Sequence, residues 1–450
     1  IAFGDPGGAP VHRRGRVEQR PDLELTVGHR VTDVRSHGAR GDCPVHPADI
    51  VLAGHVDAGV VQVGTGPRQQ TEVVADYALA VKRTEQPTTW PPHGPPGQVA
   101  TLILPADVSW SEGGVPAPMP TLTVPPVADD AVVATIAKAL QGGGKTALLL
   151  GARALREPAL MAAARIAAKT GVKLYAEVFP TRIERGAGLP HVERIAYLAE
   201  LASTQLAGLK HLVLVDAKSP VSFFAYPGKP SDLVPEGCTV HRLATYEQDA
   251  VAGLDKLVAA LGAQDVQPEL QTPQRPERPS GELSAEKVCQ AIGALLPERA
   301  IIVDESQTSG VKLPSFTRGA PRHDVLTLTG GAIGQSLPNA VGAAIACPDR
   351  PVLALVGDGS AMYTIQALWT MAREQLNVTT VVFNNKSYAI LNMELQRVGA
   401  TGKGDKARSQ LDIGNPGLDF VQLAQGMGVQ AVRATTAEEF NRALEAALRT

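Results

Sequence analysis

The stretch VLALVGDGSAMYTIQALWTMAREQLNVTTVVFNNKSY, residues 352–388, decides the fold class. Two apolar runs, Val352–Val356 and Val378–Phe383, flank a segment, Thr364–Glu374, whose composition favours a helix. Runs of apolar and β-branched residues joined by a crossover helix are typical of parallel sheets that are covered on both faces. The pattern therefore predicts a β–α–β unit in which the carboxyl ends of the two strands lie side by side.

The same alternation of strand and helix signals continues outward over residues 282–450 and recurs over residues 127–264. The other predicted strands are Thr146–Leu150, Val172–Ala176, His211–Val215, Val240–Leu243, Ala300–Val303 and Val325–Leu328. The other predicted helices are Ala131–Leu140, Pro158–Ala168, His191–Ala202, Ala285–Leu296, Pro338–Ala346 and Ala437–Leu448. Residues 265–281 are polar and proline-rich, which predicts a linker. We expect an α/β protein with tandem three-layer α/β/α domains and mostly parallel sheets.

The amino-terminal part of the chain has a different character. Residues 1–70 contain eight Arg and no Lys, and sustain neither the strand nor the helix period. Two interpretations stay open: a disordered basic arm, or a segment translated out of frame. Residues 71–126 contain a helix-like stretch, a short apolar run and a proline-rich connector.

Composition narrows the classes of function. The chain has 450 residues, of which 44% are hydrophobic and 19% charged, so it can form more than one packed core. A net charge of −3 does not fit a nucleic-acid-binding protein. Four distant cysteines without a CxxC pair argue against disulfide scaffolds and zinc sites, and favour a reducing, cytoplasmic location. No apolar run is long enough to predict a membrane span.

Polar residues with metal-binding chemistry follow both strands of the opening stretch. Asp358 lies between two glycines directly after the first strand, and Asn385 follows the second strand 27 residues later. Glycines at a strand–helix turn let backbone amides approach an anion. The carboxylate of Asp358 and an anion bound at this turn would repel each other, so the arrangement requires a divalent cation between them. Hard oxygen ligands, completed by phosphate oxygens and water, suit Mg²⁺.

A second glycine-rich sequence, Gly142–Thr146 (GGGKT), does not predict a phosphate site. Its order is helix–loop–strand, whereas a phosphate-binding loop connects a strand to a following helix. We interpret these glycines as the end of a helix.

The pairing of GDGS at 357–360 with NN at 384–385 resembles the cofactor motif of thiamine diphosphate-dependent enzymes. Residues 282–450 resemble their diphosphate-binding domain, and residues 127–264 resemble their middle domain. Residues 71–126 resemble only a remnant of their pyrimidine-binding domain and its connector, which implies that this domain is largely absent or degraded. Within the group, the chain is most similar to acetolactate synthase large subunits, with benzoylformate decarboxylases next.

The resemblance implies roles for individual residues. Asp358, Asn385 and the main-chain oxygen of Ser387 would bind Mg²⁺. Ile333 would force the cofactor into a bent shape, and the carbonyl of Gly331 would accept from its amino group. The full set of implied cofactor-binding residues is Thr308, Ser309, Gly331, Ile333, Gly357, Asp358, Gly359, Ser360, Asn385 and Tyr388.

The implied activity is decarboxylation of a 2-oxo acid such as pyruvate and its joining to a second 2-oxo acid, as in branched-chain amino acid biosynthesis. It would take place in a homo-oligomer, a dimer or tetramer, with the active site between subunits. A simple decarboxylase and a non-catalytic cofactor-binding fragment are the alternatives.

Two family features are missing from the sequence. The family's catalytic glutamate has no counterpart, because Glu18, Glu24, Glu72 and Glu85 lie in unrelated contexts, so we identify no catalytic residue and expect an incomplete chain. Acetolactate synthases also bind FAD on the middle domain. Here Lys218–Ser231, which includes Phe223, Phe224 and Lys229, has no phosphate-binding fingerprint, so FAD is not favoured but stays open.

Overall fold

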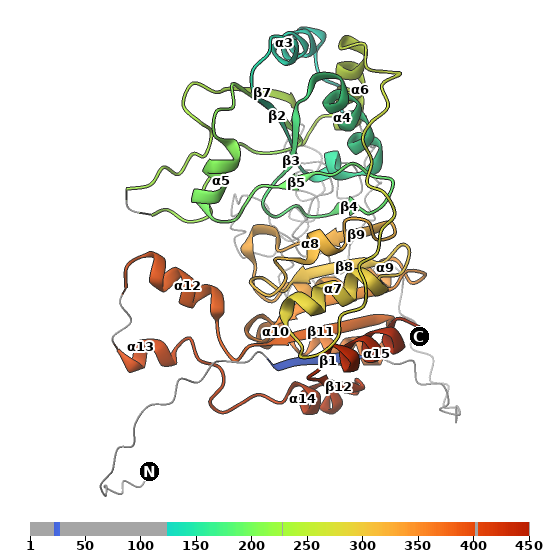
Figure 1. Ribbon diagram of the computed structural model, residues 1–450, viewed down its shortest axis with the longest axis vertical. Helices are drawn as coiled ribbons and strands as arrows, with labels where there is room; N and C mark the ends of the chain where they lie inside the picture. Colours follow the sequence, from blue (N-terminus) through green and yellow to red (C-terminus); the bar gives the residue numbers. More distant parts are fainter. Residues whose placement is uncertain (1–21, 28–123, 227, 401–403, 450) are drawn as a thin grey trace, which may run out of the picture.

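The computed structural model describes residues 124–226, 228–400 and 404–449, together with the backbone of residues 22–27 (Figure 1). They form two α/β units, which we call the central unit (residues 127–264) and the C-terminal unit (residues 282–449 with 22–27). In Figure 1 the central unit lies at the top and the C-terminal unit below it. Apart from residues 22–27 and 124–126, the predictions for residues 1–126 lie outside the described residues.

The central unit is built on a five-stranded sheet in which all neighbouring strands are parallel. Its strands, in spatial order, are β5 (Glu193–Arg194), β3 (Lys173–Ala176), β2 (Thr146–Leu150), β6 (His211–Val215) and β7 (Thr239–Ala244). Its helices are α3 (Asp130–Gln141), η1 (Ala152–Leu155), α4 (Glu157–Thr170), α5 (Ala199–Leu206) and α6 (Ala250–Ala260).

Helices cover both faces of this sheet, as the sequence predicts. Leu148 and Leu150 of β2 point into one core with α3, α4 and α6, whereas Ala147 and Leu149 point into another with α5. This alternation explains why β2 is apolar at successive positions: both of its faces are buried. Gly142 caps α3, and the glycines after it take positive φ angles before β2 begins. The prediction of a helix end at GGGKT is therefore confirmed.

One predicted helix of the central unit is wrong. Residues 191–198 are not helical, and the helix of this region, α5, begins only at Ala199. The reason is tertiary: β5 adds to the edge of the sheet beside β3, and Ile195 N–H donates to the carbonyl of Ala176. Hydrogen bonds to a sheet edge thus replace those of the helix predicted over His191–Ala202.

The C-terminal unit is built on a seven-stranded mixed sheet. Its strands, in spatial order, are β12 (Ala431–Ala434), β1 (Asp22–Val27), β11 (Val378–Asn384), β10 (Val352–Gly357), β8 (Ile301–Glu305), β9 (His323–Leu326) and β4 (Ile183–Arg185). The four strands β11, β10, β8 and β9 are parallel. Strand β1 runs antiparallel to both β11 and β12, so it joins the amino-terminal part of the chain to this sheet.

Helices again form layers on both sides of the sheet. They are α7 (Ala285–Leu295), α8 (Leu313–Phe316), η2 (Thr329–Gly331), α9 (Ser336–Ala346), α10 (Asp358–Thr364), α11 (Ala367–Arg373), α12 (Ala389–Arg397), α13 (Asp405–Ser409), α14 (Phe420–Gly426) and α15 (Ala437–Leu448). Helices α7 and α15 pack on one face, and α9, α11 and α14 pack on the other. The predicted helix Thr364–Glu374 is thus only partly confirmed, since a helix ends at Thr364 and α11 begins at Ala367. None of the helices in the described ranges has the length and apolarity needed to cross a bilayer.

One strand from residues 127–264 pairs with the sheet of the C-terminal unit and so connects the two units. β4 lies between β3 and β5 in sequence, yet it pairs with β9 at the edge of the C-terminal sheet.

Residues 265–281 contain no helix and almost no other regular structure, and they hydrogen-bond to both units. Gly188 N–H donates to the carbonyl of Gln271, and Gln274 N–H donates to that of Gly319.

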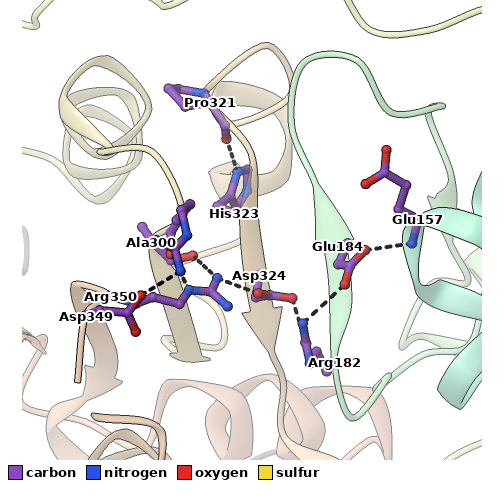
Figure 2. A network of polar contacts seen from close by, with 10 residues as sticks. Glu157, Arg182, Glu184, Ala300, Pro321, His323, Asp324, Asp349 and Arg350 are labelled. Carbon is purple, nitrogen blue, oxygen red and sulfur yellow. Dashed lines mark hydrogen bonds and ion pairs between the residues drawn. The ribbon is translucent and has the colours of Figure 1, made fainter. Parts of the chain in front are cut away.

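An ion-pair network reinforces this junction (Figure 2). Asp324 on β9 accepts from Arg182 Nε of the central segment at 2.6 Å and from Arg350 Nη2 at 2.5 Å. Arg182 also pairs with Glu184, whose carboxylate accepts from the backbone N–H of Glu157 at the start of α4. Beside it, burial lowers the pKa of His323 to about 4, so this imidazole is neutral at pH 7.

Asp324→Asn is expected to destabilise the protein by about 2–3 kcal/mol, because it leaves two arginines facing each other without their shared carboxylate. The free energy of urea-induced unfolding measures this. Asp130→Asn is the matched control: Asp130 forms an exposed ion pair with Lys256 outside this network, and exposed pairs contribute little. Equal effects of the two substitutions would contradict a stabilising role for the junction network.

Candidate functional site

Asp358 lies where β10 ends and α10 begins, and its side chain is buried. Its Oδ1 accepts from the backbone N–H of Gly359 at 2.8 Å, and its Oδ2 accepts from the backbone N–H of Lys386 at 2.5 Å. Burial raises the pKa of this carboxyl to about 6, although backbone N–H donors oppose the shift. Within the described ranges, no cationic side chain pairs with it. A buried carboxylate without a counter-charge suits a bound cation.

The pairing of β10 with β11 brings the loop that begins at Asn385 next to Asp358. The two strands are parallel, with Gly357 opposite Phe383, so their carboxyl ends are adjacent. Lys386 takes a positive φ of 58°, which turns the chain sharply after the strand. Asn385 Oδ1 accepts from the backbone N–H of Ser387 at 3.0 Å. Asp358 and Asn385 thus lie on neighbouring strand ends, as the sequence predicts.

The loop after β11 is held in place from its other side. The backbone N–H of Tyr388 donates to the carbonyl of Leu411 at 2.9 Å, and the hydroxyl of Ser387 donates to the same carbonyl at 3.2 Å. Asn392 Nδ2 in turn donates to the Ser387 hydroxyl at 2.7 Å. The main-chain oxygen of Ser387 accepts from Ala389 N–H at 2.9 Å and would share its lone pairs with any metal ion.

Tyr388 packs directly on Gly359. A Cβ atom at position 359 would lie 2.5 Å from Cε1 of the tyrosine ring, closer than any van der Waals contact. Glycine is therefore required here by the ring above it.

A glycine-rich loop, residues 329–335, contacts the end of α10. Gly330, Gly331 and Gly334 all have positive φ angles, which side chains rarely tolerate. Thr364 Oγ1 at the end of α10 donates to the carbonyl of Gly334 at 2.5 Å. Ile333 of this loop is 44% exposed, an unusual position for a large apolar side chain and one that suits contact with a ligand.

Glu305 fixes this loop, and sequence reasoning missed it. The residue ends β8, is 1% exposed, and accepts from Gly334 N–H at 2.5 Å and from Ser336 N–H at 2.8 Å. One carboxylate therefore holds both the loop and the start of α9. The available signal was an acidic residue at the end of a buried strand, directly before residues assigned to the site.

The central unit reaches the same loop through an aromatic cluster, made of Phe179, Tyr197, Phe223, Phe224 and Tyr226. Phe223 lies so close to Gly331 that a Cβ atom there would be 2.5 Å from the ring. Lys229 forms an ion pair with Glu200. The three residues named for the FAD question, Phe223, Phe224 and Lys229, thus all make contacts within the chain.

Thr308 and Ser309 lie in the turn after β8, which is the neighbour of β10 in the sheet. Their hydroxyls make no hydrogen bond to any part of the chain that the structure describes. Thr308 lines a cavity of about 750 Å³ between the two units, together with Ile390 and Met393 of α12. Both hydroxyls are therefore available to a ligand at the carboxyl edge of the sheet.

Across the described ranges, no three side chains of His, Cys, Asp or Glu lie close enough to hold a metal ion. A metal at Asp358 would therefore depend on amide and main-chain oxygens and on oxygens of a bound phosphate. This donor chemistry suits Mg²⁺, which usually binds through one or two carboxylates plus substrate phosphates.

Comparison with known proteins assigns the chain to a class of enzymes. Residues 307–450 match the family described as thiamine pyrophosphate enzyme, C-terminal TPP binding domain. The chain is 51% identical over 457 residues to an acetolactate synthase large-subunit-like protein, IlvX of Mycobacterium tuberculosis, covering 98% of this chain and 81% of the relative. The chain therefore belongs to the family of thiamine diphosphate-dependent enzymes, in its acetolactate synthase-like branch.

Further relatives agree with this assignment. Benzoylformate decarboxylase of Pseudomonas aeruginosa is 36% identical over 171 residues, which is 37% of this chain and 30% of the relative. A thiamin diphosphate-dependent enzyme from Mycobacterium smegmatis has the same fold, with a TM-score of 0.62 at 22% identity over 85% of this chain and 73% of its own. A 4-hydroxybenzoylformate decarboxylase of Rhodococcus jostii matches with a TM-score of 0.57 at 25% identity, over 77% and 65% of the two chains. The family and the fold class expected from the sequence are confirmed.

Glu305→Gln is expected to loosen the glycine-rich loop, because an amide can accept only one of the two N–H groups and presents a donor to the other. Amide hydrogen exchange of the peptide 329–336, measured by mass spectrometry, should accelerate by about 10- to 100-fold. Glu298→Gln, at an exposed position before β8, is the matched control. Unchanged exchange in Glu305→Gln would show that the carboxylate does not hold the loop.

Proposed function

We propose that the C-terminal unit binds thiamine diphosphate together with Mg²⁺ at the carboxyl ends of β10 and β11. The observation that carries this proposal is Asp358, a buried carboxylate with no cationic partner in the described residues, next to the strand end that bears Asn385. A divalent cation would supply the missing positive charge, and the diphosphate would supply oxygen ligands.

Each side of the site has a role in this proposal. The carboxylate of Asp358, the amide oxygen of Asn385 and the main-chain oxygen of Ser387 hold the metal. Residues Gly357, Gly359 and Ser360 face the diphosphate, and Thr308 and Ser309 donate their free hydroxyls to it. Ile333 presents an exposed apolar side chain to the cofactor. The carbonyl of Gly331 accepts a hydrogen bond from the cofactor's amino group, and Tyr388 packs against the cofactor's rings.

The reaction is the decarboxylation of a 2-oxo acid followed by carboligation to a second 2-oxo acid. When bound, thiamine diphosphate supplies an electron sink for this chemistry. The protein's own part is to orient it: Glu305 fixes the loop that carries Gly331 and Ile333, and Phe223 of the aromatic cluster contacts that loop at Gly331. The high identity to an acetolactate synthase large-subunit-like protein supports carboligation.

Simple decarboxylation is the second candidate function. It is favoured by the similarity to benzoylformate decarboxylase and by the 4-hydroxybenzoylformate decarboxylase among the structural neighbours. A third alternative, cofactor binding without turnover, follows from the lack of an identified catalytic glutamate. A homo-oligomer with the active site between subunits and a cytoplasmic location remain predictions.

Asp358→Ala is expected to weaken Mg²⁺-dependent binding of thiamine diphosphate by at least 100-fold, because it removes the only charged metal ligand. Calorimetric titration of the cofactor with and without Mg²⁺ measures this effect. Asp265→Ala removes an exposed carboxylate from another part of the chain and should leave the affinity unchanged. If Asp358→Ala binds the cofactor as tightly as the parent protein, the metal assignment is wrong.

Product analysis separates the candidate functions. With pyruvate, thiamine diphosphate and Mg²⁺, carboligation yields acetolactate, whereas simple decarboxylation yields acetaldehyde. We expect acetolactate as the main product. Acetaldehyde alone would favour the decarboxylase, and cofactor binding without release of CO₂ would favour the non-catalytic alternative.

A further inference from the structure

The cavity between the two units carries a second chemical signal besides Thr308. Three arginines from three separate segments line it: Arg185 at the end of β4, Arg194 on β5, and Arg318 shortly after α8. His191 lines it as well. Sequence reasoning placed His191 at a helix start and did not single out the arginines, because only tertiary structure brings these segments together.

None of these three arginines forms an ion pair with any described residue. Arg185 Nη2 donates only to a main-chain carbonyl, that of Pro314, at 2.8 Å. Arginines elsewhere on the same junction behave differently, since Arg182 and Arg350 are both paired with Asp324 (Figure 2). The cavity therefore brings together guanidinium groups that form no ion pair with any described residue.

The arginines on the cavity wall repel one another and lower the pKa values of neighbouring groups. Burial, followed by the charges of Arg194 and Arg318, lowers the pKa of Arg185 to about 10. Burial, and then Arg318 and Arg185, also lower the pKa of His191, whereas the charge of Glu193 opposes this shift. Such mutual repulsion is relieved when an anion binds among the groups.

The acidic residues on the cavity wall have other partners. Glu193 accepts from Gln205 Nε2 at 2.6 Å, and Asp304 accepts from the backbone N–H of Ser306 at 3.1 Å and from its hydroxyl. These donors are neutral, so both carboxylates keep their charge, and two negative groups face three arginines on the cavity wall. The cavity retains an excess of positive charge.

The remainder of the wall links the arginines to the proposed cofactor site. Ile390 and Met393 belong to α12, which begins directly after the predicted metal-binding loop, and Thr308 is a predicted diphosphate-binding residue. Phe179 and Leu328 add apolar surface. A volume of about 750 Å³ far exceeds what pyruvate needs and lies within the range of ordinary ligand pockets.

We propose that this cavity binds the distal acidic group of a 2-oxo acid substrate that carries a second carboxylate, with Arg185, Arg194 and Arg318 as its anion-binding residues. The proposal rests on the proposed function, because it names the substrate class of the same site. Guanidinium groups match carboxylates in two-pronged hydrogen bonds, and the apolar wall suits the methylene chain between the two acidic ends. Phosphate groups share this anion chemistry and must be distinguished by experiment.

The test compares two ligands of similar length by calorimetric titration of the full chain: 2-oxoglutarate, which has an acidic tail, and 2-oxohexanoate, which has an apolar one. We expect 2-oxoglutarate to bind at least 10-fold more tightly, and its affinity to fall as NaCl is raised. Arg194→Gln and Arg318→Gln, alone and combined, should remove this preference. Arg278→Gln, whose guanidinium pairs with Glu445 outside the cavity, should retain it.

Equal affinity for the two acids, or a preference that survives the double substitution, would overturn the proposal. Tight binding of inorganic pyrophosphate at the arginines without a preference for 2-oxoglutarate would also overturn it, and would assign the cavity to phosphate-bearing ligands. Titration of thiamine diphosphate with Mg²⁺ separates the two proposals. Normal cofactor binding without the dicarboxylate preference refutes only this inference, whereas loss of cofactor binding refutes the proposed function and, with it, the substrate role of the cavity.

Discussion

The parallel pairing of β10 with β11 is the constraint on which the site depends. It places the Asp358 carboxylate beside the loop that begins at Asn385, and the backbone N–H of Lys386 closes this contact at 2.5 Å. The arrangement exists because both strands are buried on both faces, which fixes their register and brings their carboxyl ends to one edge. A slip of one residue would turn Asp358 away from that edge and separate the two motifs.

The loops around this contact are held in place by hydrogen bonds to backbone groups. Glu305 binds two amides of the glycine-rich loop, and Leu411 accepts from both Tyr388 and Ser387. Glycines at 331 and 359 leave room for the rings of Phe223 and Tyr388. Loops fixed in this way need little rearrangement to receive a ligand, which lowers the entropic cost of binding.

The junction between the units has two different electrostatic regions. In one, Asp324 neutralises Arg182 and Arg350, and the network stabilises the contact between β4 and β9. In the other, Arg185, Arg194 and Arg318 face a cavity without carboxylate partners. The first region fits a structural role and the second fits ligand binding, although Arg182 of the first and Arg185 of the second are only three residues apart in sequence.

The sequence by itself determined the fold class, most of the strands and the pairing of Asp358 with Asn385. Strands such as β2, β10 and β11 are rich in apolar and β-branched residues and buried along their length, and two motifs after neighbouring strands must meet at one sheet edge. Tertiary structure alone decided the edge strands, the conformation of residues 191–198 and the contacts between distant segments. β4 is too short and polar to predict from its own residues, and residues 191–198 follow the sheet edge instead of forming a helix. The hydrogen bonds from the glycine-rich loop to Glu305, and the cavity lined by three arginines, depend on contacts between segments far apart in the chain. Local sequence carries no signal for such contacts.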